Sequence, residues 1–444
     1  MSETSRRTLE RARELAAELS PAMIDLTRAL VRTRSVTGDE RAISELLLHR
    51  LAELGYGQAY RDDWGNVVGV VDGTRPGPTL LFNGHMDVVE EGNRDAWAPY
   101  DPWGAELDVR RTPALAPPLG TGLPDEPAAV LHGRGVADLK GGMAAQVYAG
   151  AVLARLVAEG FDVPGRYLLL QVAMEEPGEM FSMRRFVRDT MPARGLSVDA
   201  MVCCEPSSLR LALGHRGRVE MKVVVHGRSC HGSSPWLGVN ALVHAARLIG
   251  AIEEQVWGNG RSHPELGRAG IAPTILDVSP NALAIIPDRV EFILDRRIVP
   301  GESVASVVGE IRDVIARLAA EDETFRAEVD VNRYERTSYT GAVDVEEASK
   351  ESWLIEADHP FVRAAGAGLA AVGEPVVHTH WPFSTDVPAI AALGKPCVGY
   401  SGTQEESIHT EHEYARVDYL QRSLAGNVGI YLAAASLPAE AFTL

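Results

Sequence analysis

The sequence lacks features that mark several classes of protein, beginning with positive charge. Its 43 Lys and Arg residues are outnumbered by 61 Asp and Glu residues, which gives a net charge of −18 over 444 residues. Proteins that bind nucleic acid carry a basic face or stripe, and segments that bind anionic lipid are rich in Lys and Arg. The acidic balance therefore argues against nucleic acid and against a membrane surface as partners.

Cysteine and long apolar runs are also scarce. The four cysteines form no C-x-x-C pair and are too few to staple a secreted domain of this length. Residues 1–20 are charged throughout and lack the apolar stretch of a signal peptide. No uncharged apolar run approaches the roughly 18 residues that a membrane helix needs. We therefore expect a soluble, cytoplasmic protein with reduced thiols.

The pattern that is present is typical of an α/β protein. Four short apolar runs bounded by Gly and Pro predict strands that are buried on both faces. These runs are residues 67–71, 79–87, 166–174 and 200–206. A helix is predicted over 141–160, and strands that alternate with helices favour a doubly wound, mostly parallel sheet. The segment before Leu54 also has helical spacing, with a break after which Thr37 or Asp39 is the candidate helix cap.

From Gly214 the pattern changes to that of a half-exposed sheet. The segment RVEMKVVVHG alternates in period two, and the elements predicted after it complete the order β-α-β-β-α-β of a ferredoxin-like unit. We predict an inserted α+β domain at 214–335, with 1–213 and 336–444 forming the catalytic domain. Residues 92–132, which contain seven prolines, predict a long loop, and such loops are usually functional lids or disordered.

Polar side chains follow the predicted strands at the ends where open α/β sheets place their sites. These residues are His85, Asp87, Asp138, Glu175, Glu176, Glu205 and His409. Each is ordinary when taken alone, because a histidine at a strand end is often only hydrogen-bonded. The pair Glu175–Glu176 differs, since it directly follows the apolar strand LLLQVAM, where charged side chains need a reason. The convergence of these residues at one edge predicts a metal site.

The residue types indicate what such a site would hold. Two imidazoles and three carboxylates without a thiolate suit two zinc-like divalent ions. Asp138 is the candidate bridge, because two nearby cations repel unless an anion lies between them. Asp87, two residues after His85, can orient that imidazole. Glu175 and Glu176 point to opposite sides of an extended chain, so one can bind metal while the other acts as general base on a metal-activated water.

The ordered motifs HMD, GRGVADLKGG, EE, CEP and SIHTEHE resemble the metallopeptidase and deacylase family of acetylornithine deacetylase, succinyl-diaminopimelate desuccinylase and glutamate carboxypeptidase. The resemblance covers nearly the whole chain and implies two divalent ions, with zinc expected and cobalt or manganese as alternatives. The implied ligands are His85, Asp138 and Glu205 for one ion and Asp138, Glu176 and His409 for the other. The resemblance also implies that Glu175 is the base, that Asp87 orients His85, and that the peptide Asp138–Leu139 is cis.

In the inserted domain the resemblance extends to three more residues. GRSCHGSSPWLGVNA resembles the segment whose histidine reaches across a dimer interface to stabilise an oxyanion, which implies a homodimer and gives that role to His231. LDRRIVPGE resembles the motif whose arginine clamps the substrate carboxylate, which points to Arg297, with Arg296 facing the other way. The alternative interpretations are a loop histidine and a surface ion pair. Asn240 is a further candidate for substrate contact, and Ala284 stands where the family often carries Asn, so we expect recognition of the substrate backbone to differ.

Together these features predict an enzyme that cleaves an amide bond next to a free carboxylate, in a small substrate such as an N-acyl amino acid or a short peptide. A carbamoyl or ureido hydrolase and an aromatic-amine aminohydrolase are the alternatives on the same scaffold. A non-catalytic metal-binding sensor is disfavoured, because it would not need Glu175. We interpret His378 and His380 as pocket or core residues, with Asp386 near the site.

Overall fold

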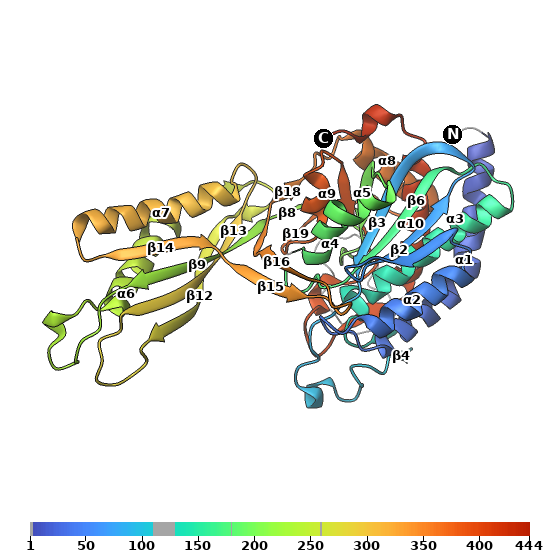
Figure 1. Cartoon of the computed structure of the whole chain (residues 1–444). Coiled ribbons are helices and arrows are strands. Elements are labelled where there is room, and N and C mark those ends of the chain that lie inside the picture. Colours follow the sequence, from blue (N-terminus) through green and yellow to red (C-terminus); the bar gives the residue numbers. More distant parts are fainter. Residues whose placement is uncertain (1–2, 110–128, 179, 258–259) are drawn as a thin grey trace.

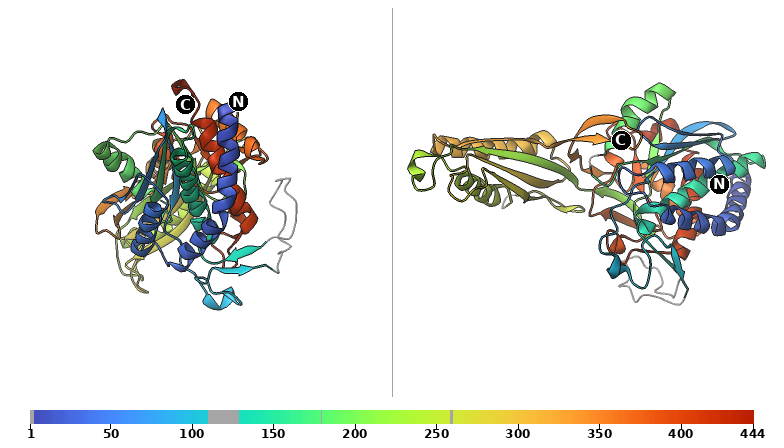
Figure 2. Two further views of the ribbon diagram at one scale, coloured as in Figure 1. Left: turned by 90° about the vertical axis from the view of Figure 1, so that its right-hand side faces the viewer. Right: turned by 60° about the horizontal axis from the view of Figure 1, so that its bottom comes forward.

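Two sheets organise the chain. The computed structural model describes residues 3–109, 129–178, 180–257 and 260–444. A nine-stranded sheet forms the centre of a large unit, and a five-stranded sheet forms the centre of a small unit. The small unit extends away from one side of the large unit (Figures 1 and 2). Each unit has its own cluster of buried apolar side chains.

The centre of the large sheet is parallel. Its neighbouring strands, in spatial order, are β6 (Pro164–Val172), β3 (Arg75–His85), β7 (Ala200–Cys203) and β20 (Cys397–Gly399). The flanking strands are antiparallel to their neighbours except β19; they are β1 (Gln58–Arg61), β2 (Val67–Asp72), β8 (Leu211–His215), β18 (Trp353–Leu354) and β19 (His378–Trp381). Because parallel strands end at the same edge, the residues that follow β3, β6 and β7 are brought together.

Helices cover both faces of this sheet, which confirms the predicted doubly wound fold class. Four helices contact one another on one side of the sheet: α1 (Glu3–Arg32), α3 (Gly141–Ala158), α8 (Pro360–Val372) and α10 (Val417–Ala434). The short helices α4 (Phe181–Arg185) and α5 (Met191–Arg194) lie on the other side (Figure 2). Among the described helices, Val136–Ala158 has the length and apolar composition of a membrane span, and 78% of its apolar window is buried inside the protein.

The second helix, α2 (Arg41–Glu53), shows one prediction to be wrong. Its N-cap is Glu40, which makes no side-chain capping bond, so neither Thr37 nor Asp39 caps the helix. The hydroxyl of Thr37 donates instead to Oδ2 of Asp87 (2.8 Å), and Oε1 of Glu40 accepts from the backbone N–H of Met174 (3.1 Å). The connection between the two helices lies against the strand ends, so its polar side chains bond there.

The small unit has the predicted ferredoxin-like order. Its elements are β9 (Gly217–His226), α6 (Ala241–Ile252), β12 (Gly270–Ser279), β13 (Arg289–Ile298), α7 (Val304–Glu321) and β14 (Arg326–Val331). The spatial order is β12-β13-β9-β14, and all pairs are antiparallel. Both helices pack on the same cluster of apolar residues. Strand β12 is an open edge strand, because β13 is its only neighbour among the described strands of this sheet.

The chain returns to the large unit through two further pairings. A hairpin of β15 (Arg333–Thr337) and β16 (Val343–Glu347) is followed by β17 (Ser349–Lys350), which pairs with the beginning of β9. Of the loop predicted at 92–132, residues 110–128 lie outside the described residues. Its ends form β4 (Glu106–Asp108) and β5 (Val130–His132), which join β21 (Tyr414–Arg416) in a three-stranded sheet.

Candidate metal centre

Three adjacent strands bring the first residues of the site together. His85 is the last residue of β3, and Glu205 follows its neighbour β7. Glu175 and Glu176 follow β6, the neighbour on the other side. Nε2 of His85 lies 3.7 Å from Oε1 of Glu205, and both side chains are nearly inaccessible to solvent. The predicted convergence at the carboxyl edge of the sheet is therefore present in the tertiary structure.

Asp138 lies between two imidazoles. Its Oδ1 is 3.1 Å from Nε2 of His85, and its Oδ2 is 3.1 Å from Nε2 of His409. The peptide bond from Asp138 to Leu139 is cis, as the family resemblance implies. Burial opposes ionisation of this carboxyl, but the hydrogen bonds with His409 and His85 outweigh it and hold the pKa of Asp138 below its usual value. The two oxygens of one carboxylate thus face two separate nitrogen ligands, which is the arrangement that a bridge requires.

The other carboxylates are crowded in the same buried space. Oε2 of Glu176 is 3.2 Å from Nε2 of His409. Burial, followed by the negative charge of Asp138, raises the pKa of Glu176 to about 7, and the same two causes raise the pKa of Glu205. The hydrogen bonds from His409 to Asp138 and Glu176 raise the pKa of that imidazole to about 10. The raised pKa values mean that bound protons neutralise part of the negative charge of these crowded carboxylates.

These residues fit a pair of divalent ions. Oε1 of Glu176 is buried and has no hydrogen-bond partner. The ligand atoms of His85, Glu175 and Glu205 lie within 4.8 Å of one another, and so do those of His85, Asp138 and Glu176. Hard carboxylate oxygens with imidazole nitrogens and no thiolate suit zinc or a similar ion.

Asp87 supports the site differently from the sequence-based expectation. Nδ1 of His85 donates to the backbone carbonyl of Asp87 at 2.9 Å, whereas the nearest carboxylate oxygen of Asp87 is 3.8 Å away. That carboxylate accepts from the backbone N–H groups of Glu175 (3.0 Å) and Glu176 (3.1 Å). The carbonyl therefore fixes the orientation of the imidazole, so that Nε2 is directed at Asp138, while the carboxylate fixes the glutamate pair.

The sequence analysis missed two charged residues at the site. Oε1 of Glu175 accepts from Nζ of Lys350 at 2.6 Å, and both side chains are buried. Glu413 is buried and accepts from the backbone N–H groups of Ala137 (2.9 Å) and Asp138 (3.0 Å), which holds the segment that carries the bridge. Glu413 lies in the motif SIHTEHE, but Lys350 lies in SKES, a polar stretch that looks like protein surface.

The histidines of β19 are outside the cluster. His378 is exposed and is therefore not a core residue, whereas Nε2 of His380 lies 3.3 Å from Oε2 of Glu265 in the small unit. Neither belongs to the groups of potential metal ligands found among the described residues. Asp386 is near the site as predicted, since its Oδ1 is 3.9 Å from Nζ of Lys350.

The three candidates in the small unit lie at opposite ends of its sheet. Arg297 pairs with Arg218 at the end that joins the large unit, and its Nε donates to Oδ1 of Asp295 at 2.8 Å. His231 follows the other end of β9 and is exposed, in a loop beside the Ala284 segment. Because β9 has ten residues, this end is about 30 Å from the junction. Asn240 lies near that distal loop, where its Oδ1 accepts from two N–H groups as the N-cap of α6.

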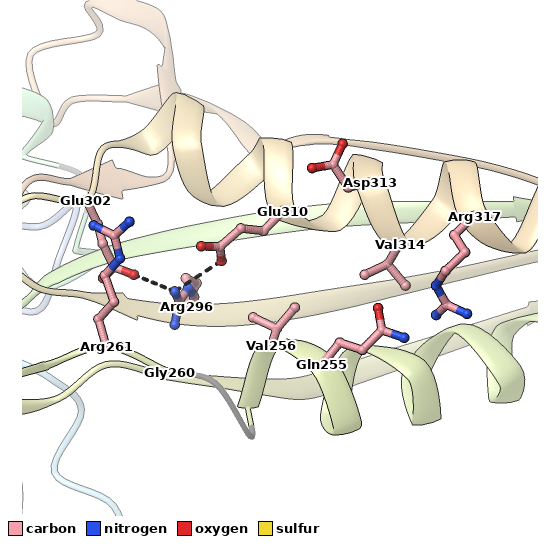
Figure 3. A pocket seen from close by; sticks show the side chains of 10 residues that line it. All are labelled: Gln255, Val256, Gly260, Arg261, Arg296, Glu302, Glu310, Asp313, Val314 and Arg317. Carbon is pink, nitrogen blue, oxygen red and sulfur yellow. Dashed lines mark hydrogen bonds and ion pairs between the residues drawn. The ribbon is translucent and has the colours of Figure 1, made fainter.

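Arg296, the neighbour of Arg297, faces the helices as predicted. It is almost fully buried, and its guanidinium bonds Glu302 (2.7 Å) and Glu310 (3.2 Å). The side chain lines a cavity of about 380 Å³ between α7 and the segment after α6 (Figure 3). Alternation along β13 thus sends two adjacent arginines into different environments.

Known proteins resemble this chain in sequence and in fold. A family model described as "Peptidase family M20/M25/M40" matches residues 81–426. The uncharacterized protein YgeY of Escherichia coli is 28% identical over 91% of both chains. Succinyl-diaminopimelate desuccinylase of Halorhodospira halophila is 29% identical over 67% of this chain and 73% of its own.

Solved structures extend the likeness to nearly the whole fold. The aminopeptidase PepT of Bacillus cereus superposes with a TM-score of 0.70 at 18% identity, covering 94% of this chain and 99% of its own. A dinuclear metal-binding peptidase of Bacillus subtilis, YXEP, gives a TM-score of 0.65 at 15% identity with the same coverage. At these identities the superpositions show a shared fold.

Proposed function

Because the chain belongs to peptidase family M20/M25/M40 and is therefore a metal-dependent hydrolase of amide bonds, we propose that its substrate is an N-acyl amino acid or a short peptide with a free carboxylate beside the scissile bond. The observation that supports the metal-dependent reaction is the position of Asp138 between His85 and His409, at 3.1 Å from each imidazole. Glu175 lies close to one of these two histidines, His85.

In this proposal two ions share Asp138. His85 and Glu205 complete one set of ligands, and Glu176 and His409 complete the other. The close approach of Glu175 to His85 and Glu205 would also allow it to bind metal. We assign it as the base because one of its oxygens is already bonded to Lys350. Zinc is the ion that we propose, with cobalt or manganese as substitutes.

The chain's own residues then have the following roles. Bound divalent ions would supply a Lewis acid that polarises the scissile carbonyl and lowers the pKa of water. Glu175 takes the proton from the attacking water and passes it to the nitrogen of the leaving amine. Arg297 pairs with the substrate carboxylate, and it lies at the end of β13 next to the large unit. The products are a carboxylate and a free amine.

We further propose that the protein is a homodimer in which His231 of the partner subunit donates to the developing oxyanion. The distal position of His231 supports action in trans, because the length of β9 separates it from its own metal centre. The open edge strand β12 exposes Ile275 and Leu276, and the adjacent helix α6 exposes Leu242 and Val243. Apolar side chains on an open edge are typical of a surface that another chain covers.

The same proposal divides the chain at the predicted boundaries, with 1–213 and 336–444 as the catalytic domain and 214–335 as a lid and dimerisation domain. Separate apolar clusters support the division. A cytoplasmic location is proposed as well, and the absence of disulfides among the four cysteines, all of them in the described residues, supports it.

The test couples metal content to amine release. The purified protein is analysed for metal and assayed with ninhydrin on N-acyl amino acids and dipeptides. We expect about two ions per chain and release of free amino acid, and we expect Glu175→Gln to retain the ions while it loses most turnover. Release of ammonia from carbamoyl or aryl-amine substrates instead would assign the alternative chemistry. A Glu175→Gln variant with undiminished turnover would contradict the role of the base.

A further inference from the structure

The ion pair between Lys350 and Glu175 is unusual because both partners are buried beside other carboxylates. The side chain of Lys350 is 1% exposed and that of Glu175 is 10% exposed. Nζ of Lys350 donates to Oε1 of Glu175 at 2.6 Å, so a single oxygen of the carboxylate is engaged. The same carboxylate has an oxygen within 4.8 Å of the ligand atoms of His85 and Glu205. The group assigned as base is therefore close both to a fixed cation and to the metal centre.

A second carboxylate holds the lysine in place. Oδ1 of Asp386 is 3.9 Å from Nζ of Lys350, is buried, and has no hydrogen-bond partner. Asp386 forms the N-terminal boundary of helix α9 (Val387–Ala391), so its position is fixed by the large unit. An ammonium held between two anions in a buried space has little freedom to move away from Glu175.

The lysine comes from the junction between the two units. Strand β17 carries Lys350 and pairs in register with Val219 and Arg218 at the beginning of β9, the strand that enters the small unit. Gly217 precedes this pairing, and a Cβ at that position would meet the carbonyl oxygen of Lys350 at 2.5 Å. The entering and leaving strands are thus in backbone contact at the position from which Lys350 reaches the metal centre.

We propose that Lys350 is a positioning residue that fixes the orientation of Glu175, a role that rests on the proposed function. Its ammonium holds Oε1, which leaves Oε2 to face the water and the leaving amine. Because β17 pairs with the strand that enters the small unit, the orientation of the base depends on the backbone pairing at the junction. Lys350 does not contact the substrate in this proposal; it acts through Glu175.

The kinetic test compares Lys350→Met, Lys350→Arg and Glu175→Gln with the double variant. We expect Lys350→Met to lower kcat about 100-fold, since small misplacements of a reacting group have effects of this size, while KM and the content of two ions stay unchanged. Lys350→Arg should recover part of the loss. In the Glu175→Gln background, Lys350→Met should lower kcat no further. The matched control is Lys222→Met, which removes a half-exposed lysine of β9 that pairs with Glu291 on β13 and should leave kcat unchanged.

Two kinetic outcomes would overturn the proposal. A rise in KM with kcat retained would mean that Lys350 binds the substrate carboxylate, and independent losses in the double variant would mean that it does not act through Glu175. A second measurement needs no turnover: in the ion-free protein, each single variant should lower the melting temperature, and the double variant should recover part of it, because it removes the partner that each single variant leaves unpaired. Additive decreases in melting temperature would contradict a direct interaction between Lys350 and Glu175. If the wild type releases no amine from any substrate, the proposed function fails while this measurement still reports on the pair.

Discussion

The metal centre and the cavity of Figure 3 both bring charged groups together, and they differ in the balance of those charges. The cavity is lined by Arg261, Arg296 and Arg317 and by Glu302, Glu310 and Asp313, so cations and anions are equal in number. At the metal centre, carboxylates outnumber the fixed cation Lys350, and the pKa values of Glu176 and Asp386 are raised to about 7 by burial and by neighbouring acids. The excess of carboxylates over cations, and not the presence of a cavity, therefore distinguishes the metal centre.

Removing the ions should have the largest effect, because it acts on the metal centre and leaves the cavity unchanged. A chelator should abolish amine release, and zinc should restore it. In the ion-free protein the raised pKa values of Glu176 (about 7) and His409 (about 10) mean that the folded state binds protons more tightly than the unfolded chain. Their stabilising contribution is complete below the unfolded pKa values and is lost as the pH rises through the folded ones.

The melting temperature of the ion-free protein should therefore fall between about pH 4.5 and pH 10, and the increase on adding zinc should grow over the same range, because the ions bind the deprotonated ligands. Calorimetry with and without zinc measures both. Glu310→Gln, in the balanced cavity, should leave the zinc-dependent increase unchanged. An increase that is independent of pH would mean that these groups are not the ligands.

The next effect concerns the two ends of the small unit. His231→Ala should lower kcat by about 10² to 10³-fold, the loss seen when one oxyanion donor is removed. Mixing it with Glu175→Gln in equal amounts should restore activity to about a quarter of the wild-type value, since half of all dimers would be mixed and each mixed dimer would carry one complete site out of two. Failure to complement after subunit exchange would contradict action in trans.

Introducing charge on the open edge tests the same interface. Ile275→Asp combined with Val243→Asp should yield a monomer whose kcat resembles that of His231→Ala, measured by light scattering and assay. Leu393→Asp, at an exposed apolar position in the large unit, should leave both the mass and the activity unchanged. A fully active monomer would remove the need for a partner.

A smaller effect should separate the adjacent arginines. Arg297→Met should raise KM by about 10- to 100-fold with little change in kcat, because one charged hydrogen bond to the substrate is lost. Arg296→Met should leave KM unchanged and lower the melting temperature, because Glu302 and Glu310 lose their buried partner. A raised KM in Arg296→Met with an unchanged KM in Arg297→Met would mean that Arg296, and not Arg297, binds the substrate carboxylate.

The smallest effect is expected at Asn240. Asn240→Ala should lower the free energy of unfolding by about 1 kcal/mol through the loss of a helix cap, and Asn240→Asp should retain most of it. Both variants should keep the wild-type KM. A rise in KM for both, measured with dimers intact, would instead support the predicted contact with substrate.

The sequence alone predicted the elements and the ligand types well for a physical reason. Strands and helices follow from local periodicity, and polar residues after apolar strands collect at one edge whenever the strands are parallel. His85, Glu175 and Glu205 could be placed in this way. The role of Thr37 could not be predicted in this way: it does not cap the helix, because its hydroxyl bonds Asp87 at the end of a distant strand.

The sequence by itself thus determined the doubly wound fold class, the ferredoxin-like order and the residues at the strand ends. Only the tertiary structure decided which charges meet. Lys350 lies 175 positions from Glu175 in a stretch with no apolar periodicity, and the pairing of β17 with β9 is what brings the two together. Asp87 likewise serves the glutamate pair through its carboxylate and His85 through its carbonyl. Such long-range pairings depend on packing between elements, which local sequence patterns do not encode.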